Sequence, residues 1–146
     1  MSKKNDSRLS LKSNFLIQLF DKDGNLKDER LIHNTVTTAG KNGVADQILA
    51  SPTLTKIGWM AIGTGSPAAN ALGTEIERIA FDTLARSGAV DTIETYFGPG
   101  VGTGALTEAG TFDDVSAGNM WMSATFSVIN KGASDSLQVT WTLTVS

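Results

Sequence analysis

The last ten residues of the chain alternate strictly between apolar and polar side chains. A period of two built from β-branched and aromatic residues is typical of a strand with one buried face. The pattern predicts a terminal strand whose apolar residues pack in the core, namely Leu137, Val139, Trp141, Leu143 and Val145.

Two further regions have clear strand patterns. Residues 15–20 and 26–33 flank Asp21–Asn25, whose Asp, Gly and Asn residues favour a turn, so the three segments predict a β-hairpin. Residues 120–129 alternate again. Their predicted buried face consists of Met120, Met122, Ala124, Phe126 and Val128.

The middle of the chain is less regular. Residues 57–62 predict a buried strand. The segment 74–86 suits either a helix with one apolar face or a strand. We favour a strand from about Arg78, because a turn at Ser87-Gly88 leads into the alternating residues 90–97 and completes a second hairpin.

One helix is predicted, at about residues 39–50. Thr38 is a suitable N-cap residue, and Ser51-Pro52 is a stop signal. The predicted apolar face of this helix consists of Val44, Ile48 and Leu49.

These elements predict a mainly β protein. Short strands separated by glycine-rich turns are typical of an antiparallel β-sandwich or a jelly-roll-like barrel, here formed by a single domain at residues 14–146. Residues 1–13 are polar and charged without periodicity, and they predict an extended or disordered N-terminal arm.

The composition excludes several classes of site. The 146 residues suit one domain and include no cysteine, which rules out disulfides, thiolate metal sites and a cysteine nucleophile. The N-terminus lacks the apolar stretch of a signal peptide, and no apolar run is long enough to span a membrane. The net charge is −3. Residues 1–41 contain eight Lys and Arg residues and five acidic residues, whereas residues 42–146 contain four Lys and Arg residues and ten acidic residues. No basic patch is dense enough to predict nucleic-acid binding.

Three glycine-containing segments suggest ligand sites, but turns and loops explain them better. Gly63–Ala68 matches the loosest dinucleotide-binding pattern, G-x-G-x-x-A, yet no sustained helix follows it. Asp21–Asn25 resembles a calcium loop only superficially, because its glycine is fourth rather than sixth and its twelfth position is Ile32. The Gly98–Gly104 loop lacks the Gly-Lys-Ser/Thr ending of a P-loop. The sequence therefore predicts no cofactor and no metal site.

The remaining polar candidates do not form a catalytic set. His33 is the only histidine, and the chain has no Gly-x-Ser-x-Gly elbow for a serine triad. Paired carboxylates at Asp113-Asp114 and at Glu75 and Glu77 carry no sign of a cleft. The three tryptophans are Trp59, Trp121 and Trp141. They could form a sugar-binding platform, but packing in the protein explains them better. We therefore predict no catalytic residues and no enzyme activity.

Five segments follow one another along the chain: Trp59–Gly65, Thr74–Ala80, Gly104–Phe112, Met120–Phe126 and Lys131–Trp141. In this order they resemble a family of small virion proteins of tailed bacteriophages. That family has an A-I-G-T-G strand end, a T-E-A-G-x-F turn (here Thr107–Phe112) and a K-x-x-x-D-x-L-x-V-x-W terminal strand. The resemblance covers about residues 34–146, and residues 1–33 have no counterpart in it.

The resemblance implies a non-enzymatic structural protein of the virion, assembled in the cytoplasm of the host bacterium. We favour a capsid decoration (cement) protein that binds the major capsid protein or other virion subunits. A tail-fibre or baseplate component and a host-receptor (glycan) binding module are the alternatives. Symmetric sites on a particle favour a homo-oligomer such as a trimer. Residues 1–13 and the first hairpin are expected to dock on a neighbouring subunit or on the shell.

Overall fold

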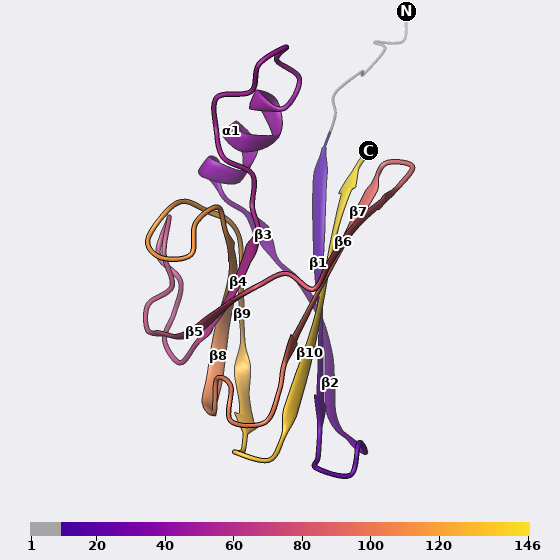
Figure 1. Cartoon of the computed structure of the whole chain (residues 1–146), viewed down its shortest axis with the longest axis vertical. Helices are drawn as coiled ribbons and strands as arrows, with labels where there is room; N and C mark the ends of the chain where they lie inside the picture. Colours follow the sequence, from indigo (N-terminus) through magenta and orange to yellow (C-terminus); the bar gives the residue numbers. More distant parts are fainter. Residues whose placement is uncertain (1–9) are drawn as a thin grey trace, which may run out of the picture.

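The computed structural model describes residues 10–146, and it consists of two antiparallel sheets and one helix (Figure 1). Sheet A contains, in spatial order, β2 (Leu26–His33), β1 (Leu11–Phe20), β10 (Ser136–Val145), β7 (Val90–Phe97) and β6 (Thr83–Ser87). Sheet B contains β3 (Thr35–Val36), β9 (Met120–Lys131), β8 (Gly104–Phe112), β4 (Trp59–Gly63) and β5 (Glu75–Ala80). The helix α1 (Thr38–Asp46) lies beyond one end of sheet B (Figure 1).

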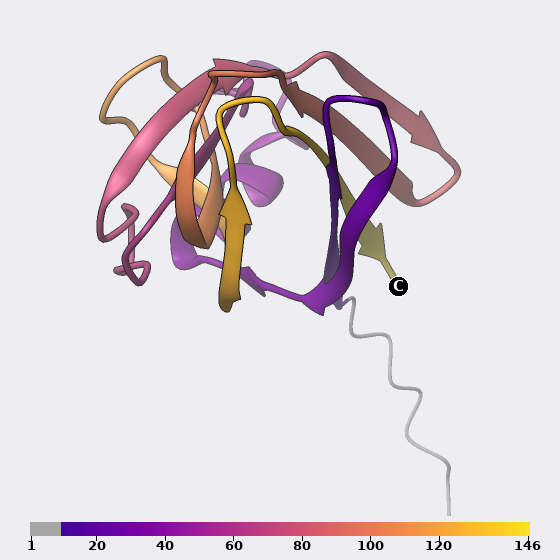
Figure 2. The same ribbon diagram turned by 90° about the horizontal axis from the view of Figure 1, so that it is seen from below.

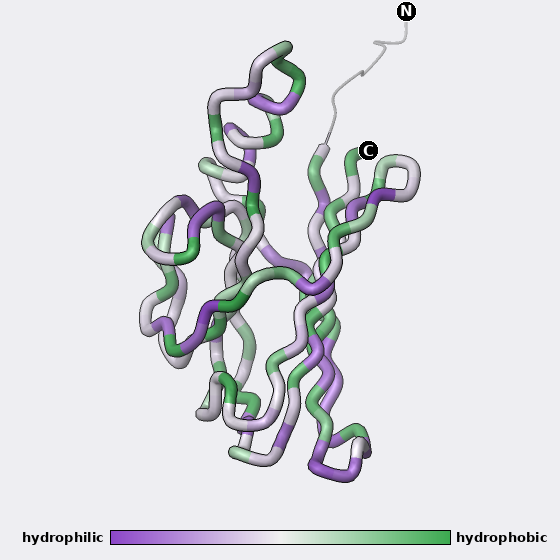
Figure 3. The backbone as a smooth tube through the Cα atoms, viewed as in Figure 1, coloured by the Kyte–Doolittle hydropathy of each residue, from purple (hydrophilic) through white to green (hydrophobic). Residues whose placement is uncertain are grey.

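The two sheets form a β-sandwich, which confirms the predicted fold class. Seen from below, the strands of both sheets curve around a common interior (Figure 2). Hydropathy alternates along many of these strands, whereas the turn between β1 and β2 is hydrophilic (Figure 3). The alternation puts apolar side chains of both sheets into one core, whose largest buried members include Trp141, Phe15, Phe97, Ile17, Met60 and Ile62.

The predicted terminal strand is β10, and it lies in the middle of sheet A between β1 and β7. Trp141 is fully buried, as expected, and its ring centroid lies 4.5 Å from that of Phe15 on β1. Its indole N–H donates to the sulfur of Met60 on β4, so this side chain ties sheet A to sheet B.

The first predicted hairpin is confirmed as β1 and β2, but β1 begins earlier than expected. Leu11 pairs with Val145, and the Ser10 N–H donates to the Ser146 carbonyl at 2.6 Å. Residues 11–13, which the sequence assigned to the arm, are therefore part of sheet A, because β10 extends far enough to pair with them. Ser10 of the predicted arm also pairs with Ser146, and residues 1–9 lie outside the described residues.

The ambiguous segment 74–86 contains two strands. The favoured strand interpretation is confirmed, although the first strand begins at Glu75 rather than at Arg78. The chain then crosses from β5 at the edge of sheet B to β6 at the edge of sheet A. The second predicted hairpin is confirmed as β6 and β7.

Two other expectations are wrong. The T-E-A-G segment, read as a turn, lies in the middle of β8, because the Glu108 side chain is buried against a neighbouring loop instead of facing water. In β9 the alternation breaks near Val128, which is exposed, while Ile129 is buried. The register between β8 and β9 shifts opposite Leu106 and Glu108, and such a bulge moves the following side chains to the other face.

The helix is shorter than predicted. Its N-cap residue is Thr37 rather than Thr38, since the Thr37 hydroxyl accepts a hydrogen bond from the Gly40 N–H. It ends at Asp46, whose carboxylate accepts hydrogen bonds from the backbone N–H groups of Thr53 and Leu54 and so draws the chain out of the helix. The predicted apolar face is therefore only partly formed: Val44 is half-buried against the core, whereas Ile48 is 88% exposed and Leu49 is also exposed.

Close backbone approach, together with the packing of Val44 on the core, holds α1 on sheet B. The Thr37 N–H donates to the Trp121 carbonyl of β9 at 2.9 Å. A Cβ atom at Gly40 would lie 2.2 Å from the same carbonyl oxygen, and one at Gly43 would overlap the Trp121 ring. The glycines that weaken the helix on its own are thus the residues that allow it to pack.

This contact predicts an inversion of the usual helix preference. Alanine favours an isolated helix over glycine by about 1 kcal/mol, yet we expect Gly40→Ala to lower the free energy of unfolding by about 1–3 kcal/mol through overpacking. Asn42→Ala, at an exposed position of the same helix, is the control and is expected to be neutral or slightly stabilising. Urea unfolding measures both variants, and a stabilised Gly40→Ala protein would contradict the contact.

Candidate functional site

The buried carboxylate of Glu108 organises the outer side of sheet B. Glu108 is fully buried on β8. Its Oε1 accepts hydrogen bonds from the N–H groups of Gly65 at 3.0 Å and Thr74 at 2.7 Å, and its Oε2 accepts one from Gly73 at 2.8 Å. The neighbouring Thr107 hydroxyl donates to the Gly65 carbonyl at 2.6 Å. Residues 64–74, which join β4 to β5, are thereby fixed over the sheet.

The glycines of this loop leave room for the carboxylate. A Cβ atom at Gly63 would lie 2.4 Å from Glu108 Oε1 and 2.3 Å from the Thr74 carbonyl oxygen. A Cβ atom at Gly73 would lie 2.3 Å from the Ser66 carbonyl oxygen. The A-I-G-T-G and T-E-A-G segments, far apart in the sequence, therefore meet at one hydrogen-bonded cluster.

Arg78 on β5 fixes a second loop, residues 113–119. Its guanidinium lies 3.7 Å above the ring of Phe112 and pairs with the Glu75 carboxylate through two nitrogens, at 3.0 and 2.6 Å. Its third nitrogen donates to the carbonyl groups of Asp114 and Ala117, both at 2.9 Å. The Arg78 side chain is only 7% exposed, so these partners replace water.

The two loops meet around a surface pocket of about 630 Å³. Asn70 links them, since its side chain donates to the Gly118 carbonyl and accepts from the Met120 N–H. The apolar residues that line the pocket are Ala68, Ala69, Ala71, Ala117 and Phe112. Glu75 and Arg78 also line it, and their opposite charges are paired with each other.

A second polar cluster lies at the turn between β9 and β10. The Asp135 carboxylate accepts hydrogen bonds from the Gly132 N–H at 2.8 Å and from the Lys27 ammonium at 3.0 Å. These contacts, and the nearby charge of Lys131, hold the pKa of Asp135 below its usual value. Lys131 is buried and donates to the Gly98 carbonyl at 3.0 Å, and its burial lowers its own pKa.

The structure does not bring the candidate catalytic residues together. His33 lies on β2 of sheet A, where its Nδ1 contacts Asn14 Oδ1 at 2.6 Å. Asp113 is in the loop after β8 of sheet B, and it accepts hydrogen bonds from the backbone and side chain of Asn119. Asp114 accepts a long hydrogen bond from the Ser116 N–H within the same loop. Glu75 pairs with Arg78, and Glu77 lies on the same edge strand.

The three tryptophans lie on three different strands. Trp141 is in the central core, and Trp121 is buried beneath α1. Trp59 is half-buried at the margin of a small second cluster on sheet B, formed by Ala61, Leu72, Phe112 and Met120. They do not make a common sugar-binding platform.

The three glycine-containing segments are turns or loops. Asp21 Oδ1 accepts hydrogen bonds from the N–H groups of Asp23 and Asn25, both at 2.9 Å, and these bonds lower the pKa of Asp21. Gly63–Ala68 leads from the end of β4 into the loop bound by Glu108. Gly98–Gly104 connects β7 to β8 and supplies the carbonyl that Lys131 binds. Within residues 10–146, no group of three or more His, Asp or Glu side chains is placed to hold a metal ion.

Sequence reasoning missed Glu108, Arg78 and Lys131 as organising residues. The available signal was their position: each is a charged residue within or beside a run of strand-forming residues. Charged side chains are rarely buried unless they are paired or hydrogen-bonded. Their partners are backbone groups of distant loops, which the sequence does not reveal.

No protein-family model matches the chain, no curated protein is significantly similar to it, and no solved structure significantly resembles its fold. Over residues 10–146, none of the helical structure is long and apolar enough to cross a membrane.

Removing the charge of Glu108 should destabilise the protein. Glu108→Gln replaces one acceptor oxygen by an NH₂ group that faces backbone donors, and unsatisfied buried donors cost about 1–3 kcal/mol each. We expect a loss of about 2–3 kcal/mol in the free energy of unfolding. Glu94→Gln, at an exposed position of β7, is the control and is expected to change it by less than about 0.5 kcal/mol. Equal denaturation midpoints for the two variants would show that the carboxylate is not a stabilising acceptor.

The stabilising contribution of Asp135 should depend on pH. The pKa of Asp135 is lower in the folded state than its ordinary value of 3.8, so the ionised carboxylate stabilises the fold at pH values above 3.8. This stabilisation is lost as the pH falls through the folded-state pKa. Asp135→Asn removes this titration. We expect the variant to be less stable than the natural protein at neutral pH and the difference to shrink on acidification below pH 3.8. Unfolding curves at several pH values test this, and a difference independent of pH would contradict it.

Proposed function

We propose that this chain is a non-enzymatic structural protein of a tailed-bacteriophage virion, and that it decorates the outer surface of the capsid as a cement protein. The observation that carries the proposal is the role of the polar residues in the segments that resemble the phage family. Glu108 and Asp135 bind backbone N–H groups, and Lys131 binds a carbonyl. Residues with these contacts maintain a scaffold, which is what a family of particle proteins would have in common.

A rigid scaffold suits binding to a shell. Loops 64–74 and 113–119 are tied down by Glu108 and Arg78, so their surface is formed before any partner arrives. Preformed surfaces lose little conformational freedom when they associate. In this role the partners are the major capsid protein or other virion subunits and further copies of the chain, and the protein resides in the virion after assembly in the host cytoplasm.

The N-terminal residues are the proposed docking element. β1 begins at Leu11, so residues 2–9 can be removed without shortening a strand. These residues include three bases, Lys3, Lys4 and Arg8, and one acid, Asp6. Their positive charge would be attracted to an acidic patch on the shell.

Heads purified from a phage that lacks the gene for this chain test the proposal. We expect the purified protein to bind these heads saturably and to raise the temperature at which they open. A variant lacking residues 2–9 should bind more weakly while its own unfolding curve stays unchanged, because sheet A is intact. Failure of the full chain to bind heads would contradict the cement role, and binding to isolated tails instead would favour the tail-fibre or baseplate alternative.

A further inference from the structure

The four edges of the two sheets differ in how strongly they resist pairing with another strand. On β2 the residues 27–30 are all charged, and β5 carries Glu75, Glu77 and Arg78. The β3 edge is only two residues long. Charged or very short edge strands prevent sheets from associating edge to edge. The remaining edge strand, β6, has five residues and is longer than β3, and it contains a single charged residue, Arg86.

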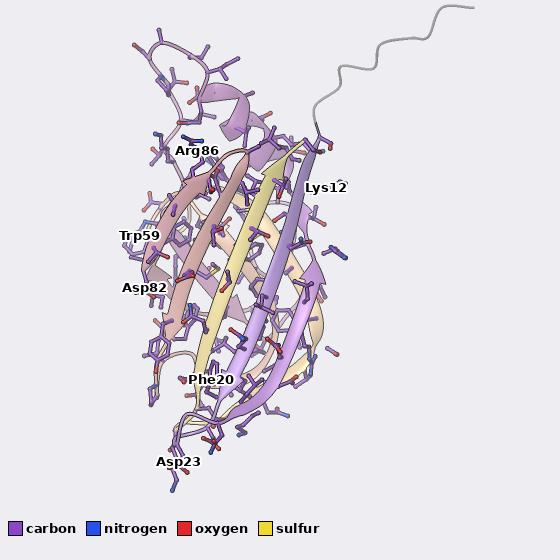
Figure 4. The ribbon with its side chains drawn as sticks, turned by 90° about the vertical axis from the view of Figure 1, so that its right-hand side faces the viewer. Lys12, Phe20, Asp23, Trp59, Asp82 and Arg86 are labelled. Carbon is purple, nitrogen blue, oxygen red and sulfur yellow. The ribbon has the colours of Figure 1, made fainter. Side chains whose placement is uncertain are left out.

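The β6 edge is also open. All five of its residues are exposed, and Leu84 at its second position is 56% exposed. In Figure 4 this strand lies at the margin of the outer side of sheet A, with Asp82 near one end and Arg86 near the other. Asp82 just before the strand, the apolar Leu84 within it and Arg86 toward its other end make this segment complementary to an antiparallel copy of itself.

The hairpin determines which backbone groups of β6 are available. Ser87 and Val90 flank the two-residue turn to β7, so they form a hydrogen-bonded pair. Hydrogen-bonded pairs alternate along an antiparallel ladder. Ala85 therefore bonds to β7, while Leu84 and Arg86 direct their N–H and C=O groups toward the open edge.

We propose that β6 pairs antiparallel with β6 of a second copy, centred on Ala85, and joins the two A sheets into one continuous sheet about a two-fold axis. In this register Leu84 faces Arg86 of the second copy on each side of the axis, which gives two hydrogen-bonded pairs. The aliphatic stem of Arg86 then covers the exposed Leu84. Asp82, whose carboxylate also accepts a hydrogen bond from the Tyr96 N–H, is a diagonal neighbour of Arg86 of the second copy, and unlike charges at this spacing attract. This pairing does not rest on the proposed function.

Single-cysteine variants test the register directly, because the natural chain has no cysteine. The Ala85 residues of the two copies would form a non-hydrogen-bonded pair with Cα atoms about 4.5 Å apart, which is within the range of a disulfide. We expect Ala85→Cys to form a disulfide-linked dimer rapidly under mild oxidation. Leu31→Cys, an exposed position on the β2 edge of the same sheet, is the matched control and should cross-link far more slowly. Equal cross-linking of the two variants would overturn the proposal.

Sedimentation of the natural chain gives a test that does not depend on the register. We expect a dimer, and Leu84→Lys should raise its dissociation constant about tenfold by placing like charges together across the axis. Leu84 is exposed, so the variant should fold normally, which its circular dichroism spectrum checks. A monomer, a trimer, or an unchanged dissociation constant for Leu84→Lys would overturn the pairing.

Discussion

The hydrogen bonds of one buried carboxylate organise the outer side of sheet B. Glu108 lies on β8, a central strand, and satisfies three backbone N–H groups of the loop between β4 and β5. A buried acidic group without partners would be strongly destabilising, so the loop and the carboxylate each require the other. The fixed loop contributes Leu72, which covers Ala61 and Phe112 on the outer side of the sheet. Arg78 then packs on Phe112 and fixes the second loop.

The two sheets therefore differ in what they offer to partners. Sheet B packs on the core with one side and is partly covered by its own loops on the other, which explains why its strands contain runs of buried residues. Sheet A has a single buried side and an outer side rich in polar residues, such as Thr140, Thr142 and Thr144 of β10. The charged β2 and β5 edges resist pairing, whereas β6 does not. Sheet B is therefore partly covered on its outer side, whereas sheet A has one accessible edge strand, β6.

Much of the fold could be predicted because alternation along a strand directly reflects which side is buried. For this reason the sequence predicts the strand at residues 137–145 and the first hairpin. The end of α1 was not, because it depends on the Asp46 carboxylate binding residues seven and eight positions later. The candidate site was not predictable either: Glu108 binds amides 34, 35 and 43 positions earlier in the chain. In the sequence, its T-E-A-G segment looks like a solvated turn, since glutamate and glycine usually favour one there.

Amide hydrogen exchange of the natural protein, followed by NMR, tests the role of Glu108 most directly. Gly65, Gly73 and Thr74 lie in a loop, and loop amides usually exchange rapidly. If the Glu108 carboxylate holds them, their amides should exchange as slowly as those of the neighbouring strand β4. Exchange at the rate of exposed loop amides, with β4 still protected, would contradict the account.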